Sequence, residues 1–355
     1  MVDFAGWRMP VQYTSIVAEH TATRTGVGLF DISHMGRLRF DGPGAGRFLD
    51  GLVTRRVADL APGRIRYALV TNHAGGILDD VLVYHLADAA GESYWMLVVN
   101  AGNREKILAW LAPFLVDAAD VQFSDATHDW AMIAVQGPGA LELVDPLVDA
   151  QLPAMKYYQG REARIDGRGG IVSRTGYTGE DGFELIVGAP AAVAMWEKLL
   201  AAGSSTPGLD SRTVPAGLGS RDTLRLEAAM PLYGHELNEQ VNPFQAGLSF
   251  AVDLENREFP GRDALAKLQD APQDRLVGLQ LRGKRVPRED YPVFHERRQV
   301  GRITSGTFSP TLKRPIAMAY VQPASAAVGT ELTIDIRGRH EQAWVVQMPF
   351  YRRKA

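Results

Sequence analysis

The most informative part of the chain is residues 75–84, with the sequence Gly-Gly-Ile-Leu-Asp-Asp-Val-Leu-Val-Tyr. Its aliphatic and β-branched residues predict a strand, although strands usually avoid aspartate. Side chains alternate between the two faces of a strand, so Asp79 and Asp80 are expected to point apart and not to act on each other as an acid–base pair. A carboxylate on an apolar face costs several kcal/mol unless a partner compensates it. At least one of these acids is therefore predicted to bind something.

A structural role would explain the same pair. Both acids could lie at the end of the strand, one solvated and the other bonded to backbone donors in the turn at Gly75 and Gly76. Carboxyl groups with shifted acidity are often structural and not catalytic. The local sequence leaves both interpretations open.

The composition is that of an ordinary globular protein. The chain has 355 residues, of which 46% are hydrophobic and 22% charged, and this length suffices for two or three domains. Charges of both signs are interleaved without a basic stripe, and no apolar run approaches the ~20 residues of a membrane span. The N-terminus lacks the pattern of a secretory signal. We therefore expect a cytoplasmic protein with neither a nucleic-acid nor a membrane partner.

The sequence argues against a metal site and against common nucleotide motifs. With no cysteine, the chain has no disulfide, no thiolate-ligated cluster and no cysteine nucleophile. Residues 235–239, His-Glu-Leu-Asn-Glu, lack the second histidine of the H-E-x-x-H zinc motif. A phosphate-loop pattern at 278–285 ends in Arg285 instead of Ser or Thr, and a dinucleotide pattern at 217–222 has Asp222 at the third glycine. We expect no metal.

Hydrophobic periodicity and turn residues predict alternating helices and strands up to about residue 260, followed by short strands alone. The later strands predict a small β-barrel or sandwich, residues 203–213 are predicted to form a loop, and no strong internal repeat is evident. Expected helices are 15–24, 43–49, 103–115, 138–147, 190–201, 219–229 and 262–268; expected strands are 37–40, 66–70, 77–86, 94–100, 130–136, 162–166, 171–174, 183–187, 275–281, 293–296, 299–304, 316–321, 331–336 and 342–347. Strands 66–70, 77–86 and 94–100 should form an antiparallel meander.

Several motifs occur together, in order, along the whole chain. They are residues 3–10 (Asp-Phe-Ala-Gly-Trp-Arg-Met-Pro), 29–36 (Leu-Phe-Asp-Ile-Ser-His-Met-Gly), 75–80, 173–184 (Ser-Arg-Thr-Gly-Tyr-Thr-Gly-Glu-Asp-Gly-Phe-Glu), 216–222 (Ala-Gly-Leu-Gly-Ser-Arg-Asp), 224–227 (Leu-Arg-Leu-Glu), 304–312 (Thr-Ser-Gly-Thr-Phe-Ser-Pro-Thr-Leu) and 348–352 (Met-Pro-Phe-Tyr-Arg). In this order and spacing the chain resembles aminomethyltransferase, the T-protein of the glycine cleavage system.

The resemblance implies an α+β fold of three domains in a cloverleaf around a central channel. Two domains would be mixed α/β, with antiparallel sheets and helices, and the third a C-terminal β-barrel. The implied domains are 1–36 plus 125–250 for folate, 37–124 carrying Asp80, and 255–355 for the barrel. Family members usually have about one helix before the Phe-Ala-Gly-Trp motif. Because this chain begins almost at that motif, we expect either a start codon assigned downstream of the true one or the loss of a bracing helix.

The resemblance also implies a reaction. The family takes an aminomethyl group from the lipoyl arm of the carrier H-protein and passes its carbon to tetrahydrofolate. The products are 5,10-methylenetetrahydrofolate, ammonia and dihydrolipoyl H-protein. The chain is thus expected to be a one-carbon transferase with tetrahydrofolate as co-substrate and lipoylated H-protein as partner.

By family position, Asp80 is the catalytic acid at the reacting end of the pterin. A carboxylate there can accept a proton and stabilise developing positive charge, and an apolar strand face would make it a better base. Asp79, facing away, is expected to hold the turn. The expected folate-binding residues are Tyr67, Asn100, Tyr158, Tyr177, Glu184, Arg221 and Arg352.

These residues carry different expected roles. Glu184 would pair with two N–H donors of the pterin, and Arg221 would meet folate oxygens unless it instead forms an ion pair with Asp222 or Glu227. Tyr67 and Tyr158 either stack on folate rings or belong to the core. His34 is expected to be buried and hydrogen-bonded, without a catalytic role.

Two other functions fit parts of the sequence. A folate-dependent demethylase of the same superfamily, acting on a small sulfonium or N-methyl compound, would keep the acid but not a surface for the H-protein. A related non-enzymatic folate-binding protein that assists iron–sulfur assembly would need a reactive cysteine, which this chain lacks.

Overall fold

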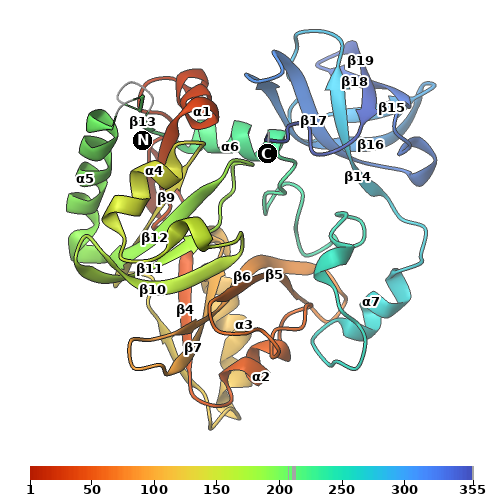
Figure 1. Ribbon diagram of the computed structural model, residues 1–355. Coiled ribbons are helices and arrows are strands. Elements are labelled where there is room, and N and C mark those ends of the chain that lie inside the picture. Colours follow the sequence, from red (N-terminus) through yellow and green to blue (C-terminus); the bar gives the residue numbers. More distant parts are fainter. Residues whose placement is uncertain (207, 210–212, 354–355) are drawn as a thin grey trace. The chain divides into compact units, whose positions relative to one another are not determined.

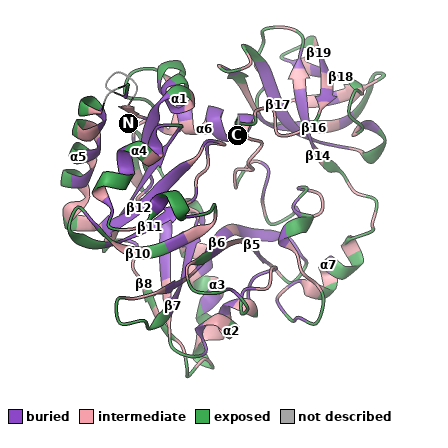
Figure 2. Cartoon of the chain, in the orientation of Figure 1, coloured by how far each residue is buried: buried purple, intermediate pink, exposed green. Residues whose placement is uncertain are grey.

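The computed structural model describes residues 1–206, 208–209 and 213–353. The chain divides into two compact units, whose helices and strands are labelled in Figure 1. Unit 1 comprises Met1–Val70, Asp79–Gly176 and Glu180–Arg221, and unit 2 comprises Thr71–Leu78, Tyr177–Gly179 and the chain from Asp222 onward. In both units the strands are largely buried and the turns exposed (Figure 2).

The main sheet lies almost entirely in unit 1. Within the described residues it has 11 strands in the order β13-β3-β9-β12-β11-β10-β5-β6-β7-β4-β8. The three strands expected as a meander are successive neighbours, as predicted. The bounds are β3 Val27–Asp31, β4 Gly36–Asp41, β5 Arg64–Thr71, β6 Ile77–Ala87, β7 Ser93–Val99, β8 Gln122–Asp125, β9 Trp130–Gln136, β10 Gln159–Ile165, β11 Arg168–Arg174, β12 Gly182–Gly188 and β13 Thr213–Pro215, with a separate hairpin of β1 Val2–Phe4 and β2 Trp7–Met9.

The main sheet contains the same topology twice, which the sequence analysis missed. The first copy is β4, α2 (Ala45–Asp50), β5, β6, β7 and α3 (Arg104–Val116); the second is β9, α4 (Ala140–Val144), β10, β11, β12 and α5 (Ala192–Ser205). The strand orders β5-β6-β7-β4 and β10-β11-β12-β9 correspond, and the copies meet where β5 lies beside β10. This junction is short, since in the described residues the register of β5 and β10 pairs Gln159 with Arg64 alone.

One short motif marks both copies. Residues 42–45 and 137–140 each read Gly-Pro-Gly-Ala and connect a strand to the following helix. The first glycine has a positive φ in both, +101° at Gly42 and +131° at Gly137. A Cβ would lie 2.4 Å from the Asp120 carbonyl oxygen at Gly42 and 2.3 Å from the Gly26 carbonyl oxygen at Gly137. Only glycine fits these two equivalent turns.

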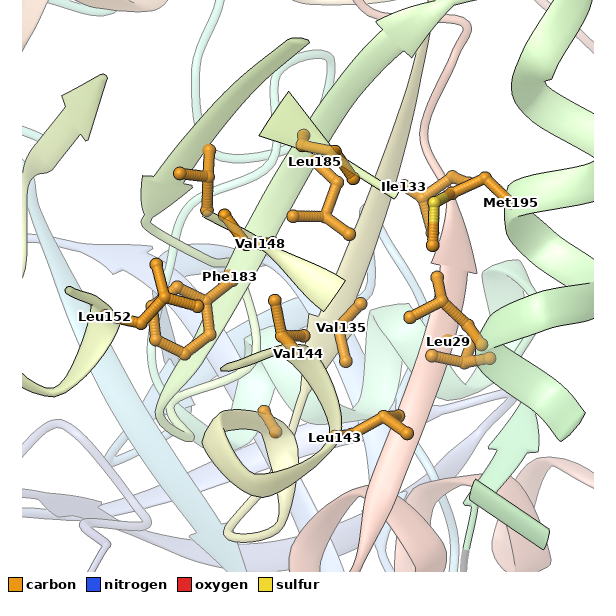
Figure 3. Packing of buried hydrophobic residues seen from close by; sticks show 14 of the residues in the cluster. Leu29, Ile133, Val135, Leu143, Val144, Val148, Leu152, Phe183, Leu185 and Met195 are labelled. Atoms are coloured by element: carbon orange, nitrogen blue, oxygen red, sulfur yellow. The ribbon is translucent and has the colours of Figure 1, made fainter. Parts of the chain in front are cut away.

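The second copy has a continuous apolar core. Side chains from α4 and α5 point toward those of β3, β9 and β12, as Figure 3 shows. Phe183 and Leu185, two residues apart, both lie on the inner face of β12, and Met195 packs against the same core from α5. Their buried area supplies the hydrophobic stabilisation that holds the helices on the sheet.

Unit 2 contains the C-terminal strands, which close into a barrel in the order β14-β17-β16-β15-β18-β19. Of the two predicted alternatives, a barrel or a sandwich, the structure has the barrel. The prediction of a mixed α/β class with a C-terminal barrel is confirmed. Unit 2 also holds α7 (Arg262–Leu268) and the end of α6 (Leu218–Glu227). The barrel bounds are β14 Arg275–Leu281, β15 Pro292–His295, β16 Arg298–Ser309, β17 Arg314–Val321, β18 Glu331–Ile336 and β19 Arg339–Val346.

A buried ion pair ties the end of α6 to the rest of unit 2. The Arg225 guanidinium lies 2.8 Å from the Glu236 carboxylate, with side chains 2% and 0% exposed. Arg225 also donates to Ser305, and Thr304 donates to Glu236. Every charge in the cluster thus has hydrogen-bond partners, which a buried pair requires.

Some expected boundaries were wrong. The predicted loop 203–213 begins inside α5, which continues to Ser205 because alanine and serine there sustain the helix and bond back to its last turn. Residues 207 and 210–212 of that predicted loop lie outside the described residues. Five short strands of the described chain, whose runs carry little alternation, were not predicted: β1, β2, β3, β8 and β13. In the part of the chain that the structure describes, no helix is long and apolar enough to cross a membrane.

We expect Gly137→Ala to destabilise the protein by more than about 2 kcal/mol, because a positive φ and a clash with the Gly26 carbonyl combine. Gly91→Ala is the matched control, since Gly91 has φ +87° but nothing within 4 Å of the added Cβ. Its cost should stay near 1 kcal/mol, roughly that of the backbone conformation alone. Urea denaturation measures both. Equal losses in the two variants would contradict the clash.

Arg225→Leu should cost about 3–5 kcal/mol, because it leaves the Glu236 carboxylate buried without its counter-charge. Arg302→Leu is the control, since the Arg302–Asp290 pair is largely exposed and worth less than about 1 kcal/mol. Circular dichroism during urea unfolding gives the two free energies. A loss for Arg225→Leu no larger than the control would show that the buried pair is not stabilising.

Candidate active site

Asp79 and Asp80 lie on β6 within the main sheet, and Asn100 follows the neighbouring β7. Asp79 is fully buried, whereas Asp80 keeps part of its surface open. The Asn100 amide nitrogen Nδ2 lies 2.8 Å from Oδ1 of Asp79 and 2.8 Å from Oδ1 of Asp80. Its backbone N–H donates to Asp79 Oδ2 at 3.0 Å. One residue therefore holds both acids.

This arrangement corrects two expectations. The two carboxylates do not point apart, because both reach Nδ2 of Asn100. This nitrogen lies 3.1 Å from the backbone carbonyl oxygen of Asp80, where side chains from either face of β6 can reach it. Nor does Asp79 hold the glycine turn. The Asn72 side chain does so, accepting from the backbone N–H groups of Ala74 and Gly76 at 2.9 Å.

Asp79 and Asp80 have raised pKa values. Burial raises the pKa of Asp80, against hydrogen bonds from Asn100 and from the Tyr67 hydroxyl, 3.3 Å from Asp80 Oδ2. Burial also raises the pKa of Asp79, and the charge of Asp80 raises it further. A carboxyl group with a raised pKa is suited to exchanging protons near neutral pH.

A second polar group runs from β6 to β12. The Tyr84 hydroxyl lies 3.3 Å from Ser173 Oγ, which lies 2.8 Å from Thr175 Oγ1. Thr175 donates to Oε2 of Glu184 at 2.5 Å. Burial raises the pKa of Glu184, while Thr175 and the charge of Arg221 lower it. Glu184 is thus a buried carboxylate that accepts from the Thr175 hydroxyl and can accept further N–H donors.

Tyr158 connects the two groups. Burial raises its pKa to about 12, with further contributions from the charges of Glu184 and Asp80 and an opposing one from Arg55. Both carboxylates are therefore close enough to act on the same hydroxyl. The backbone of Tyr158 has φ +61°, an uncommon conformation for a bulky residue. Such strain is typical of functional sites.

His34 lies beside the same region. Its burial, together with the charges of Arg221 and Arg37, lowers its pKa to about 3. Nδ1 of His34 has no hydrogen-bond partner, so the expected bonded histidine is wrong for that atom. The Arg37 guanidinium donates to the carbonyl oxygens of Ser33 and Met35, on either side of His34 in the sequence. His34 is a neutral, buried ring.

Two expected site residues belong to unit 2. The Tyr177 hydroxyl donates to the Pro231 carbonyl oxygen at 2.5 Å, and Arg352 is exposed. In the same unit Asp222 lies 2.7 Å from Arg225, and Glu227 accepts from Thr311. Tyr177, Arg352 and the role of Arg221 stay predictions.

The sequence analysis did not single out Asn103, Ser173, Thr175 and Tyr84. Asn103 donates to Asp79 at 2.6 Å and gives no signal in the sequence beyond its place before a helix. Ser173 and Thr175 lie two residues apart in the recognised segment 173–184, and Ser173 is the register partner of Glu184 on the neighbouring strand. Among the described residues, no group of three or more His, Cys, Asp or Glu could hold a metal ion.

The arrangement suits an organic ligand with N–H groups. Glu184 is a buried carboxylate for N–H donors, Asp80 is a partly open acid, and Tyr67 and Tyr158 contribute aromatic surface beside Asp80. A flat nitrogen heterocycle matches this set of acceptors and rings.

Comparisons with known proteins place the chain in one family. The GCVT N-terminal domain matches residues 1–256, and the glycine cleavage T-protein C-terminal barrel domain matches residues 275–352. The chain is 48% identical to an aminomethyltransferase of Rubrobacter xylanophilus, covering 100% of this chain and 91% of the relative. It is 46% identical to that of Streptomyces coelicolor, covering 100% and 94%.

A solved structure agrees. The crystal structure of glycine cleavage system aminomethyltransferase T from Bartonella henselae has a TM-score of 0.89 at 35% identity, covering 99% of this chain and 93% of that one. The chain therefore belongs to the aminomethyltransferase family, the one-carbon transferases that are the T-proteins of glycine cleavage.

Proposed function

We propose that the chain transfers a one-carbon unit from the S-aminomethyl-dihydrolipoyl arm of the H-protein to tetrahydrofolate. The products are 5,10-methylenetetrahydrofolate, ammonia and dihydrolipoyl H-protein. Family membership supports the reaction class, and the partly open acid Asp80, held by Asn100 and Tyr67, is the observation that carries the mechanism.

The chemistry must move protons as well as carbon. Two N–H bonds of the folate, one C–S bond and one C–N bond break, while two N–C bonds, one S–H bond and one N–H bond form. Tetrahydrofolate supplies the two nitrogen nucleophiles when it is bound. The protein must accept a proton at one point and return it to a leaving group at another.

Asp80 is the proposed proton acceptor. Its raised pKa makes it a stronger base than an exposed aspartate, and its partial exposure leaves it accessible. Asn100 orients it through Oδ1 and Tyr67 through Oδ2. As the ionised form it would also stabilise positive charge that develops on the transferred carbon.

The other residues bind and orient. Glu184 would accept two N–H donors of the pterin, while the Thr175 hydroxyl donates to its Oε2 atom and orients the carboxylate. Tyr67 and Tyr158 would flank the rings, and Arg221 would meet folate oxygens. Tyr177 and Arg352, which resemble family positions, complete the proposed set together with Asn100.

The assay combines the purified protein, aminomethyl-loaded H-protein and tetrahydrofolate. Ammonia and 5,10-methylenetetrahydrofolate should appear in equal amounts, and omission of folate should slow ammonia release strongly. The demethylase alternative is tested in parallel with N-methyl and sulfonium donors in place of the loaded carrier. Turnover with those donors and none with the carrier would overturn the proposal.

Asp80→Asn should keep the affinity for tetrahydrofolate within about tenfold, or 1.4 kcal/mol, because the amide preserves the shape of the side chain. Turnover should fall by far more, since an amide does not accept the proton. Calorimetry measures the affinity and ammonia release the turnover. Glu92→Gln, on the exposed turn between β6 and β7, is the control. Wild-type turnover in Asp80→Asn would remove Asp80 from the chemistry.

Glu184→Gln should weaken tetrahydrofolate binding at least tenfold, because a neutral amide presents one acceptor where the carboxylate presents two. Thr175 can still donate to the new side-chain oxygen, so the fold should be retained. Glu162→Gln is the control, since that carboxylate accepts from Tyr94 instead. Unchanged affinity by calorimetry would exclude Glu184 from the folate site.

A further inference from the structure

Asp79 is a buried acid that the proposed mechanism does not use. It is 0% exposed and lies next to the acid that the mechanism does use. A buried carboxyl group without a role would be costly, because burial disfavours its charge. Its contacts indicate what it does.

Within the described residues, the hydrogen bonds to the Asp79 carboxyl group come from N–H donors. The donors are the Asn100 backbone at 3.0 Å, the Asn100 amide at 2.8 Å and the Asn103 amide at 2.6 Å. A protonated carboxyl group must itself donate, and none of these described contacts offers it an acceptor. These three N–H donors therefore favour the ionised form of Asp79, and they act against its burial and the charge of Asp80, both of which raise its pKa.

Asp80 has different partners. Oδ2 of Asp80 meets the Tyr67 hydroxyl, which can donate to a carboxylate or turn to accept from a protonated carboxyl group. Asp80 also keeps part of its surface open. It can therefore gain and lose a proton without leaving a buried group unpaired.

We infer that Asp79 is a positioning residue that stays ionised while Asp80 gains and loses a proton. It fixes the Asn100 amide that both acids share, and its negative charge determines how readily Asp80 holds that proton. This inference rests on the proposed function of Asp80. Oδ1 of each carboxylate lies 2.8 Å from the same nitrogen, so the two groups are close enough to interact strongly. They titrate as a coupled pair and not as independent groups.

The charges around the pair fix the sign of the effect. Tyr67 on β5 and Tyr158 before β10 face Asp80 as neutral hydroxyls, and Arg55 acts on Tyr158. Asn100 and Asn103 are neutral amides. A negative charge on Asp79 therefore raises the pKa of Asp80, and loss of that charge must lower it.

The kinetic test is the pH dependence of turnover. Asp79→Asn should move the acid limb of the kcat profile to lower pH by about one unit or more, because Asp80 then ionises without a neighbouring charge. Affinity for tetrahydrofolate should change less than kcat. Glu92→Gln removes an exposed charge near the same strands and should leave the limb in place. A limb that stays, or moves to higher pH, in Asp79→Asn would overturn the inference.

A measurement without substrate decides the question even if Asp79→Asn does not fold. Carboxyl ¹³C resonances of aspartate-labelled protein are titrated in the wild type and in Asp80→Asn. The resonance with the highest pKa should disappear in Asp80→Asn, while the Asp79 resonance should be ionised at neutral pH. A carboxyl group that remains protonated at neutral pH in Asp80→Asn would overturn the inference. Normal turnover in that variant would instead count against the proposed function alone.

Discussion

The site depends on the hydrogen bonds that Asn100 makes to two neighbouring carboxylates on β6. Without the N–H donors on Asp79, a carboxylate that is 0% exposed would have no compensation for its lost hydration. Asn100 comes directly after β7, so the pairing of β6 with β7 sets the position of this amide. The sheet register and the acidity of Asp80 are therefore consequences of the same strand pairing.

The duplicated topology explains why the candidate site has two polar ends. The acid pair lies on β6 of the first copy, whereas Ser173 lies on β11 and Glu184 on β12 of the second. The topologies make β6 and β11 equivalent. Each copy contributes one buried carboxylate system, and Tyr158, next to β10, responds to both. A single copy would contain only one end of the site.

The sequence predicted the fold where local patterns were strong. The bounds of β9, β14, β18 and α7 match the structure, because their apolar periodicity and turn residues agree. The helix expected from residue 15 begins there because the Ser15 hydroxyl accepts from the Ala18 N–H and caps it. The sequence analysis missed the duplication, since the copies share strand order and one Gly-Pro-Gly-Ala motif but little else. The shared Asn100 amide was missed because strand alternation describes where side chains start and not where their polar ends meet.

Tyr84 reaches Ser173 across the junction of the two copies, where β5 and β10 have little regular pairing. The contact between Tyr84 and Ser173 passes over Gly160. A Cβ at this position would lie 3.5 Å from the Tyr84 ring and 3.3 Å from Ser173 Cβ, so the glycine leaves room for both side chains. The hydroxyl string that continues to Glu184 thus also fastens one half of the sheet to the other. The proposed recognition of folate by Glu184 and the cohesion of the seam thus depend on the same hydrogen bonds.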